Sequence, residues 1–156
     1  AAVDVEAVHR DAERVGAVEH LHGEGFVEFP EVDVNNAKYL TYLEQSRVSY
    51  FRDQKLWDGS ISATGMIVAR VEIDFKAPIT VADEEAVVWT RVNRLGGKSF
   101  DMEHLILVKR NDLPVTAAIS RTVIVVFDYI RNATVQIPDA WRSLMIDYDG
   151  LGPASG

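Results

Sequence analysis

One segment early in the chain is apolar around most of a helix circumference. Over residues 36–54, large apolar or aromatic side chains occupy one helix face and several positions outside it. A surface helix needs an apolar stripe only about 100° wide, so this segment has to be covered by other elements. The sequence therefore predicts a long helix packed in the middle of a domain. The side chains concerned are Tyr39, Leu40, Tyr42, Leu43, Val48, Tyr50 and Phe51.

Four segments with the alternation of β-strands follow this helix. They are predicted over residues 66–75, 86–94, 100–110 and 115–129. Gly96-Gly97 suits the hairpin turn between the second and third strands, and Asp112-Leu113-Pro114 marks the turn before the fourth. The fourth segment is apolar on both sides near its end, which predicts a central place in the sheet.

A short apolar strand before the helix completes the predicted element order. One strand, one long helix and four antiparallel strands indicate an α+β domain whose sheet wraps around a central helix. Residues 26–149 are expected to form this domain. Residues 1–25 are expected to be an extension with a short amphipathic helix, and residues 150–156 a frayed tail. After Pro138, Asp139 is expected to cap a last helix that ends at Met145.

Composition restricts the classes of function. The 156 residues fit one domain with a substantial core, and the formal charge of −8 argues against general binding to nucleic acid or anionic membranes. The absence of cysteine excludes disulfides, a thiol nucleophile and thiolate metal ligands. No apolar run approaches the ~20 residues of a membrane span, and the acidic start fits no signal peptide. We therefore expect a cytoplasmic protein.

The junction before the helix is the best candidate for chemistry. Asp33 stands at the predicted helix N-terminus, where unpaired backbone N–H groups and the helix dipole favour negative charge. A carboxylate beside such a site can support hydrolysis of an activated acyl group. The N–H groups of Asn35, Asn36 and Ala37 are the candidate oxyanion donors. Helix capping by Asp33 and the two asparagines is the competing explanation of the same residues.

This junction also resembles a known family. The stretch V-E-F-P-E-V-D, followed by V-N-N-A-K-Y-L-T-Y-L-E-Q-S-R, is similar to V-R-W-x-D-x-D and D-x-x-G-H-V-N-N-x-x-Y-L-x-Y-L/F-E-x-x-R. That pattern is characteristic of hotdog-fold acyl-CoA thioesterases of the 4-hydroxybenzoyl-CoA thioesterase type. The resemblance spans residues 26–142. The matching residues are Asp33, Val34, Asn35, Asn36, Tyr39, Leu40, Glu44 and Arg47.

The resemblance implies a hotdog fold and an acyl-CoA thioesterase that needs no cofactor, because CoA is part of the substrate. Asp33 would act as general base on water or as a nucleophile that forms a mixed anhydride, and Asn36 would mark the oxyanion site. Family members join edge to edge, so a homodimer or a tetramer is expected. Two alternatives stay open: an acyl-carrier-protein thioesterase, and a non-catalytic acyl-CoA binding protein on the same scaffold.

One departure from the family pattern affects the candidate acid. The x-x-Gly-His piece between the acidic residue and Val-Asn-Asn is absent, so that Asp33 directly precedes Val34. One alignment places Asp33 at the catalytic acid position, and a second places it at the position of the family histidine. The first keeps a carboxylate at the active site and is the alignment we adopt.

The remaining candidates lie elsewhere on the helix and strands. Tyr39 would line an acyl pocket or simply pack, whereas Glu44 and Arg47 would form a polar network near the site or the dimer seam. Three cations would contact the phosphates of CoA. The four histidines show no metal-ligand spacing, so no metal site is expected. The cations are Arg94, Lys98 and Arg131, and the histidines are His9, His20, His22 and His104.

Overall fold

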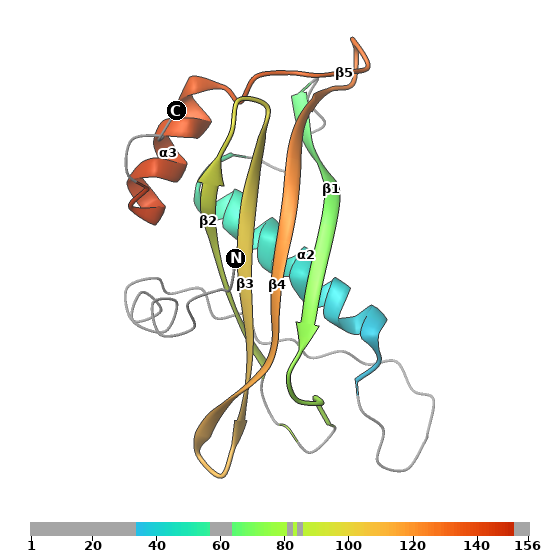
Figure 1. Cartoon of the computed structure of the whole chain (residues 1–156). Helices are drawn as coiled ribbons and strands as arrows, with labels where there is room; N and C mark the ends of the chain where they lie inside the picture. Colours follow the sequence, from blue (N-terminus) through green and yellow to red (C-terminus); the bar gives the residue numbers. More distant parts are fainter. Residues whose placement is uncertain (1–33, 57–63, 81–82, 84–85, 152–156) are drawn as a thin grey trace. The chain divides into compact units, whose positions relative to one another are not determined.

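The computed structural model of the chain describes residues 34–56, 64–80, 83 and 86–151. Its elements follow the predicted order (Figure 1). The expected strand before the helix and the expected extension of residues 1–25 lie outside the described residues. The elements are α2 (Asn36–Asp53), β1 (Thr64–Phe75), β2 (Ala86–Leu95), β3 (Ser99–Arg110), β4 (Leu113–Asp128), β5 (Ala133–Thr134) and α3 (Asp139–Asp149).

The strands form one sheet in the order β1-β4-β3-β2, and β5 pairs with β4. The β4–β5 pairing is antiparallel and joins Phe127 to Thr134 and Asp128 to Ala133. Because β4 lies between β1 and β3, the central place predicted for the fourth strand is confirmed. The combination of an antiparallel sheet with a long helix confirms the predicted α+β class.

Two tight turns join the last three long strands. At the β2–β3 turn, the Gly96 N–H donates to the Ser99 carbonyl at 2.8 Å, which confirms the predicted hairpin. The β3–β4 turn consists of Asn111 and Asp112, whose φ angles are 48° and 63°. A two-residue hairpin of this kind needs positive φ at both central residues, which Asn and Asp tolerate. The predicted turn before the fourth strand is confirmed at Asp112, but it lies earlier than Asp112-Leu113-Pro114, because it begins at Asn111 and β4 already starts at Leu113.

The chain divides into two compact units, and α2 and each long strand contribute residues to both. The first unit contains residues 34–48 with Ile73–Thr90 and His104–Ile119, and the second contains Ser49–Glu72 with Arg91–Glu103 and residues 120–151. Their cores are described separately. The fully or nearly buried apolar residues of the first unit are Tyr39, Leu43, Ile79, Val88, Leu105, Ile106, Val108, Ala117 and Ala118.

The core of the second unit forms around the end of α2. Tyr50 and Phe51 belong to an apolar cluster with residues of the strands and of α3. The rings of Phe51 and Phe100 meet edge to face, with centroids 6.3 Å apart, a geometry that aromatic pairs favour. The other buried members are Leu56, Val92, Met102, Ile124, Val126, Ile137 and Met145.

Helix α3 differs from its prediction at both ends. Pro138 occupies the N-cap position and no side chain caps the helix, so the expected capping role of Asp139 was wrong. Asp139 lies instead in the first turn, where its charge suits the positive end of the helix dipole. The helix runs past Met145 to Asp149 and ends at Gly150, whose φ of 64° is readily adopted by glycine.

The last residue of α3 makes a buried polar contact within the second unit. The Tyr50 hydroxyl donates to Asp149 Oδ2 at 2.5 Å, and the Val92 N–H donates to the same oxygen at 3.0 Å. Burial raises the pKa of Asp149 to about 6, although both hydrogen bonds and the charge of Arg91 act in the opposite direction. The carboxyl group therefore carries a cost when it ionises in the folded protein.

This cost predicts a pH-dependent stability. A carboxyl whose pKa is higher in the folded than in the unfolded state binds more protons when folded, so its contribution is greatest below about pH 4 and is lost as pH rises through about 6. Relative to Asp149→Asn, the wild type should lose about 1 kcal/mol of unfolding free energy over this interval, because solvent partly screens the charge of the incompletely buried Asp149 carboxylate. Urea unfolding of both proteins at several pH values measures the difference. Asp147→Asn, at an exposed carboxylate of the same helix, should show no such trend.

Candidate functional site

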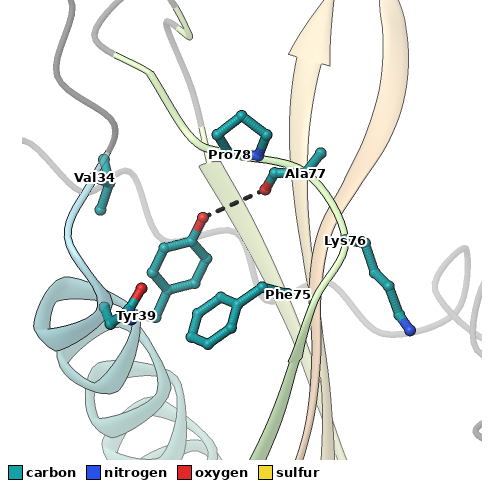
Figure 2. A pocket seen from close by; sticks show the side chains of 7 residues that line it. Val34, Tyr39, Phe75, Lys76, Ala77 and Pro78 are labelled. Carbon is teal, nitrogen blue, oxygen red and sulfur yellow. Dashed lines mark hydrogen bonds between the residues drawn. The ribbon is translucent and has the colours of Figure 1, made fainter.

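A pocket of about 300 Å³ lies in the first unit, beside the start of α2 (Figure 2). One side consists of the residues that open the helix, and the other of the segment that follows β1. This volume is at the lower end of the range for small-molecule sites. The lining residues are Val34, Asn36, Tyr39, Phe75, Lys76, Ala77 and Pro78.

The start of α2 is fixed by a local cap. Asn35 Oδ1 accepts a hydrogen bond from the Lys38 N–H at 3.1 Å, so the predicted capping by this residue is confirmed. Asn36 lines the pocket, and Ala37 is exposed. The first N–H groups of a helix have no acceptor within the helix, and together with the dipole they favour an anion. This end of the pocket therefore suits developing negative charge.

Tyr39 both lines the pocket and packs in the core. Its side chain is buried, and its ring meets the Phe75 ring edge to face at a centroid distance of 5.0 Å. Its hydroxyl points toward the segment after β1, as Figure 2 shows. The hydroxyl donates to the Ala77 carbonyl at 3.5 Å and accepts from the Ile79 N–H at 3.2 Å. Both roles considered for Tyr39 are thus compatible in one geometry.

The rest of the wall is mainly apolar. Phe75 is 48% exposed, so its ring is available at the pocket. The Lys76 side chain extends away from Tyr39 (Figure 2), and its Nζ lies 3.8 Å from Asp74 Oδ2. The pocket therefore combines aromatic surface with the N-terminus of a helix. An apolar acyl group with a polar reacting end suits this combination.

An ion pair that the sequence did not reveal fixes the end of the segment after β1, residues 77–80. Arg110 Nε lies 2.8 Å from Asp83 Oδ1, and Arg110 Nη2 lies 2.8 Å from Asp83 Oδ2. The Asp83 side chain is almost fully buried. These hydrogen bonds from Arg110, helped by those from Thr80, lower the pKa of Asp83 to about 2 despite its burial. Asp83 is therefore ionised throughout the physiological range.

The predicted pair of Glu44 and Arg47 lies farther along α2. Spacing along the helix predicts that this pair shares the apolar face of Leu40, Leu43 and Phe51. That prediction was wrong for Glu44, because Glu44 is exposed and Leu40 is 48% exposed. Arg47 is half-buried, and burial lowers its pKa while the charge of Glu44 acts to raise it. Helical geometry places Arg47 one turn after the fully buried Leu43, whereas Glu44 follows the exposed Leu40 in the same way.

His104 is buried among groups of the first unit. Its Nδ1 lies 2.9 Å from Thr90 Oγ1, and its Nε2 has no hydrogen-bond partner among the described residues. Burial, reinforced by the charge of Arg47, lowers the pKa of His104 to about 3. The imidazole is therefore neutral near pH 7. No group of three His, Asp or Glu side chains within the described ranges could hold a metal ion.

The three cations predicted to bind CoA phosphates belong to the second unit. Arg94 lies 3.7 Å from the buried carboxylate of Asp101, and Lys98 Nζ donates to the Thr134 carbonyl at 3.3 Å. Arg131 lies 3.7 Å from Asp128. Each is largely exposed, so these interactions leave room for other contacts. Their phosphate-binding role stays a prediction.

The structure thus brings Asn36 and Tyr39 together at one pocket. Asp33, like His9, His20 and His22, lies outside the described residues, and its catalytic role stays a prediction. Reasoning from sequence missed the opposite wall, formed by Phe75 to Pro78, and the ion pair behind it. The only sequence signal for this wall is Pro78, three residues after the end of an apolar strand, which marks an irregular segment. In the part of the chain described here, no helix is long and apolar enough to cross a membrane.

The sequence profile of the thioesterase-like superfamily matches residues 27–144. The chain belongs to this superfamily. It is therefore a thioester hydrolase. Among curated proteins, no sequence matches it significantly.

Solved structures of thioesterases share the fold. A thioesterase from Thermus thermophilus, solved with coenzyme A and zinc, is 30% identical, covers 81% of this chain and 92% of its own, and has a TM-score of 0.65. A member of the thioesterase superfamily from Jannaschia sp. CCS1 is 23% identical over 82% of both chains, with a TM-score of 0.71. A 1,4-dihydroxy-2-naphthoyl-CoA thioesterase from Synechocystis is 17% identical over 74% of this chain and 84% of its own, with a TM-score of 0.64. The predicted hotdog fold is thereby confirmed.

The role of the Tyr39 hydroxyl is testable through stability. Tyr39→Phe keeps the ring but leaves the Ile79 N–H without its acceptor, which should cost about 1–3 kcal/mol of unfolding free energy. Urea unfolding with an unchanged m-value measures this loss. Tyr42→Phe, which removes the hydroxyl of a less buried neighbour on the same helix, should cost less than half as much. Equal costs for the two variants would contradict the bridging role of Tyr39.

Proposed function

We propose that this thioester hydrolase cleaves an acyl-CoA to the free acid and CoA. The observation that carries the proposal is the pocket at the first turn of α2, lined by Asn36, Tyr39 and Phe75. It joins apolar surface for an acyl group to helix N–H groups for an oxyanion. The residues from Asp33 to Arg47 support the closer assignment to the 4-hydroxybenzoyl-CoA thioesterase type. The Thermus relative with bound coenzyme A supports the choice of carrier.

In the proposed reaction, Asp33 supplies the carboxylate. As a general base it takes a proton from water while the water oxygen attacks the thioester carbonyl carbon. The resulting oxyanion is stabilised by the N–H groups around Asn36 and Ala37. When the carbon–sulfur bond breaks, the thiolate of CoA leaves and takes the proton from the Asp33 carboxyl. As a nucleophile, Asp33 would instead form a mixed anhydride that water then hydrolyses.

An acyl-carrier-protein thioesterase is the second candidate, since the Val-Asn-Asn motif also occurs in that group. Matched acyl-CoA and acyl-carrier substrates with the same acyl group distinguish the two. A higher kcat/KM for the carrier would replace CoA with the carrier protein as the physiological partner. Tight binding of CoA esters without turnover would instead support the non-catalytic alternative.

The catalytic role of Asp33 has a direct test. Asp33→Asn removes the base or nucleophile and should reduce the release of CoA from an acyl-CoA panel about 10²–10⁴-fold. A thiol reagent detects the released CoA, and circular dichroism checks the fold. Asp74→Asn, at a carboxylate that is 76% exposed, is the matched control and should retain activity. Full activity in Asp33→Asn would remove Asp33 from the mechanism.

We also propose that the active form is a homodimer or a dimer of dimers. In the described sheet, β1 is an edge strand, and Val68 on it is 47% exposed. A long exposed edge with apolar side chains favours pairing with another strand. A second copy of the chain, paired along this edge, would cover it.

Light scattering tests this assembly at micromolar concentration. The mass should be at least twice the 17.4 kDa of the chain, and Val68→Lys should shift it toward the monomer because an edge lysine discourages strand pairing. Lys109→Gln, an exposed change on another strand, serves as the control. A fully active monomer would contradict the proposed assembly.

A further inference from the structure

The wall segment, residues 77–80, has no regular secondary structure, yet its backbone polar groups are engaged. The Ala77 N–H donates to the Ala117 carbonyl at 3.1 Å, and the Thr80 carbonyl accepts from the Asp83 N–H at 3.0 Å. Between these ends, the partners are side chains and the backbone of Val34, two residues before α2. Buried irregular backbone is stable only when such groups are paired. The wall segment is therefore fixed by specific contacts from outside itself.

On the pocket side, these contacts join the wall segment to the start of α2. The Tyr39 hydroxyl bridges the Ala77 carbonyl and the Ile79 N–H. The Val34 N–H donates to the Ile79 carbonyl at 2.6 Å. Val34 directly follows Asp33 in the sequence. The position of the wall segment and the position of the helix start are thus coupled through Ile79.

On the other side, the guanidinium of Arg110 contacts groups of the wall segment that the residues of α2 do not contact. Arg110 Nη2 donates to the carbonyl of Pro78, which lines the pocket, and also to Asp83 Oδ2. Asp83 in turn accepts from the Thr80 N–H at 2.8 Å and lies 3.2 Å from the Thr80 hydroxyl. The Arg110–Asp83 pair therefore contacts the wall at two residues, Pro78 and Thr80.

We infer that Arg110 is a positioning residue for thioester hydrolysis, acting through Pro78 and Asp83 on the pocket wall that opposes the first turn of α2. The inference rests on the proposed function. Arg110 does not line the pocket, so it has no direct contact with a substrate there. Its effect is on the position of the wall segment relative to the reacting carbonyl of the substrate. Small displacements of groups around a reacting atom have large effects on rate.

The planar fork of Arg110 predicts that lysine cannot replace it. Nε and Nη2 donate to the two oxygens of Asp83 while Nη2 also reaches the Pro78 carbonyl. A lysine ammonium keeps the charge but lacks this arrangement of donors. Arg110→Lys should therefore preserve the ion pair in part and lose the contact to Pro78.

Steady-state kinetics and amide exchange on the full chain test this inference. In Arg110→Lys, kcat for the best acyl-CoA should fall about tenfold or more with KM within about twofold, because positioning affects the transition state more than ground-state binding. Asp83→Asn should give the same split. Exchange of the Ile79 and Thr80 amide protons should accelerate in both variants, well below their melting temperatures. Lys109→Gln, the exposed neighbour, should match the wild type in all readouts.

The outcomes separate this inference from the proposed function. If the wild type releases no CoA from any acyl-CoA, the proposed function is wrong, and the exchange of the Ile79 and Thr80 amides alone decides whether Arg110 fixes the wall. If the wild type is active and Arg110→Lys keeps kcat within about twofold, the positioning role is wrong while the function stands. A lower melting temperature with unchanged kcat and unchanged amide exchange would also overturn it.

Discussion

The burial of one apolar face of α2 is the constraint on which the rest of the structure depends. Tyr39 and Leu43 are buried in the first unit, and Tyr50 and Phe51 in the second. A helix with this much apolar surface has no stable position in water. Once it is covered, the rotation of its first turn is fixed as well. The direction in which Asn36 and Tyr39 point at the pocket is thus a consequence of core packing.

Polar pairing then determines the shape of the site. The segment after β1 has no ladder of strand hydrogen bonds, so its carbonyl and N–H groups need other partners. Tyr39 supplies two of them from the helix, and Arg110 and Asp83 supply others from behind. In the proposed reaction, a preorganised wall of this kind would let the helix N-terminus stabilise the oxyanion without reorganisation. Tyr39 therefore takes part both in the packing of the core and in the polar pairing of the wall.

The sequence predicts the structure best where local rules decide the outcome. The helix was predicted over residues 36–54 and is found at Asn36–Asp53, and Gly96-Gly97 was correctly placed in a hairpin turn. Prediction from the sequence failed where two local rules competed. Leu113 and Pro114 look like turn residues, but Asn111 and Asp112 supply the positive φ angles that a two-residue hairpin requires. Similarly, Pro138 occupies the N-cap position of α3 that was predicted for Asp139.

The sequence by itself determined the order of the elements, the central place of β4 and, through the residues from Asp33 to Arg47, the resemblance to thioesterases. These features depend on periodicity, turn residues and a contiguous motif, all of which are local. Only the tertiary structure decided that Arg110 and Asp83 support the pocket wall, that His104 is buried and neutral, and that Leu40 is exposed. The physical reason is that each depends on partners distant in sequence. The Tyr39 hydroxyl donates to a carbonyl 38 residues away, and no local sequence pattern predicts that hydrogen bond.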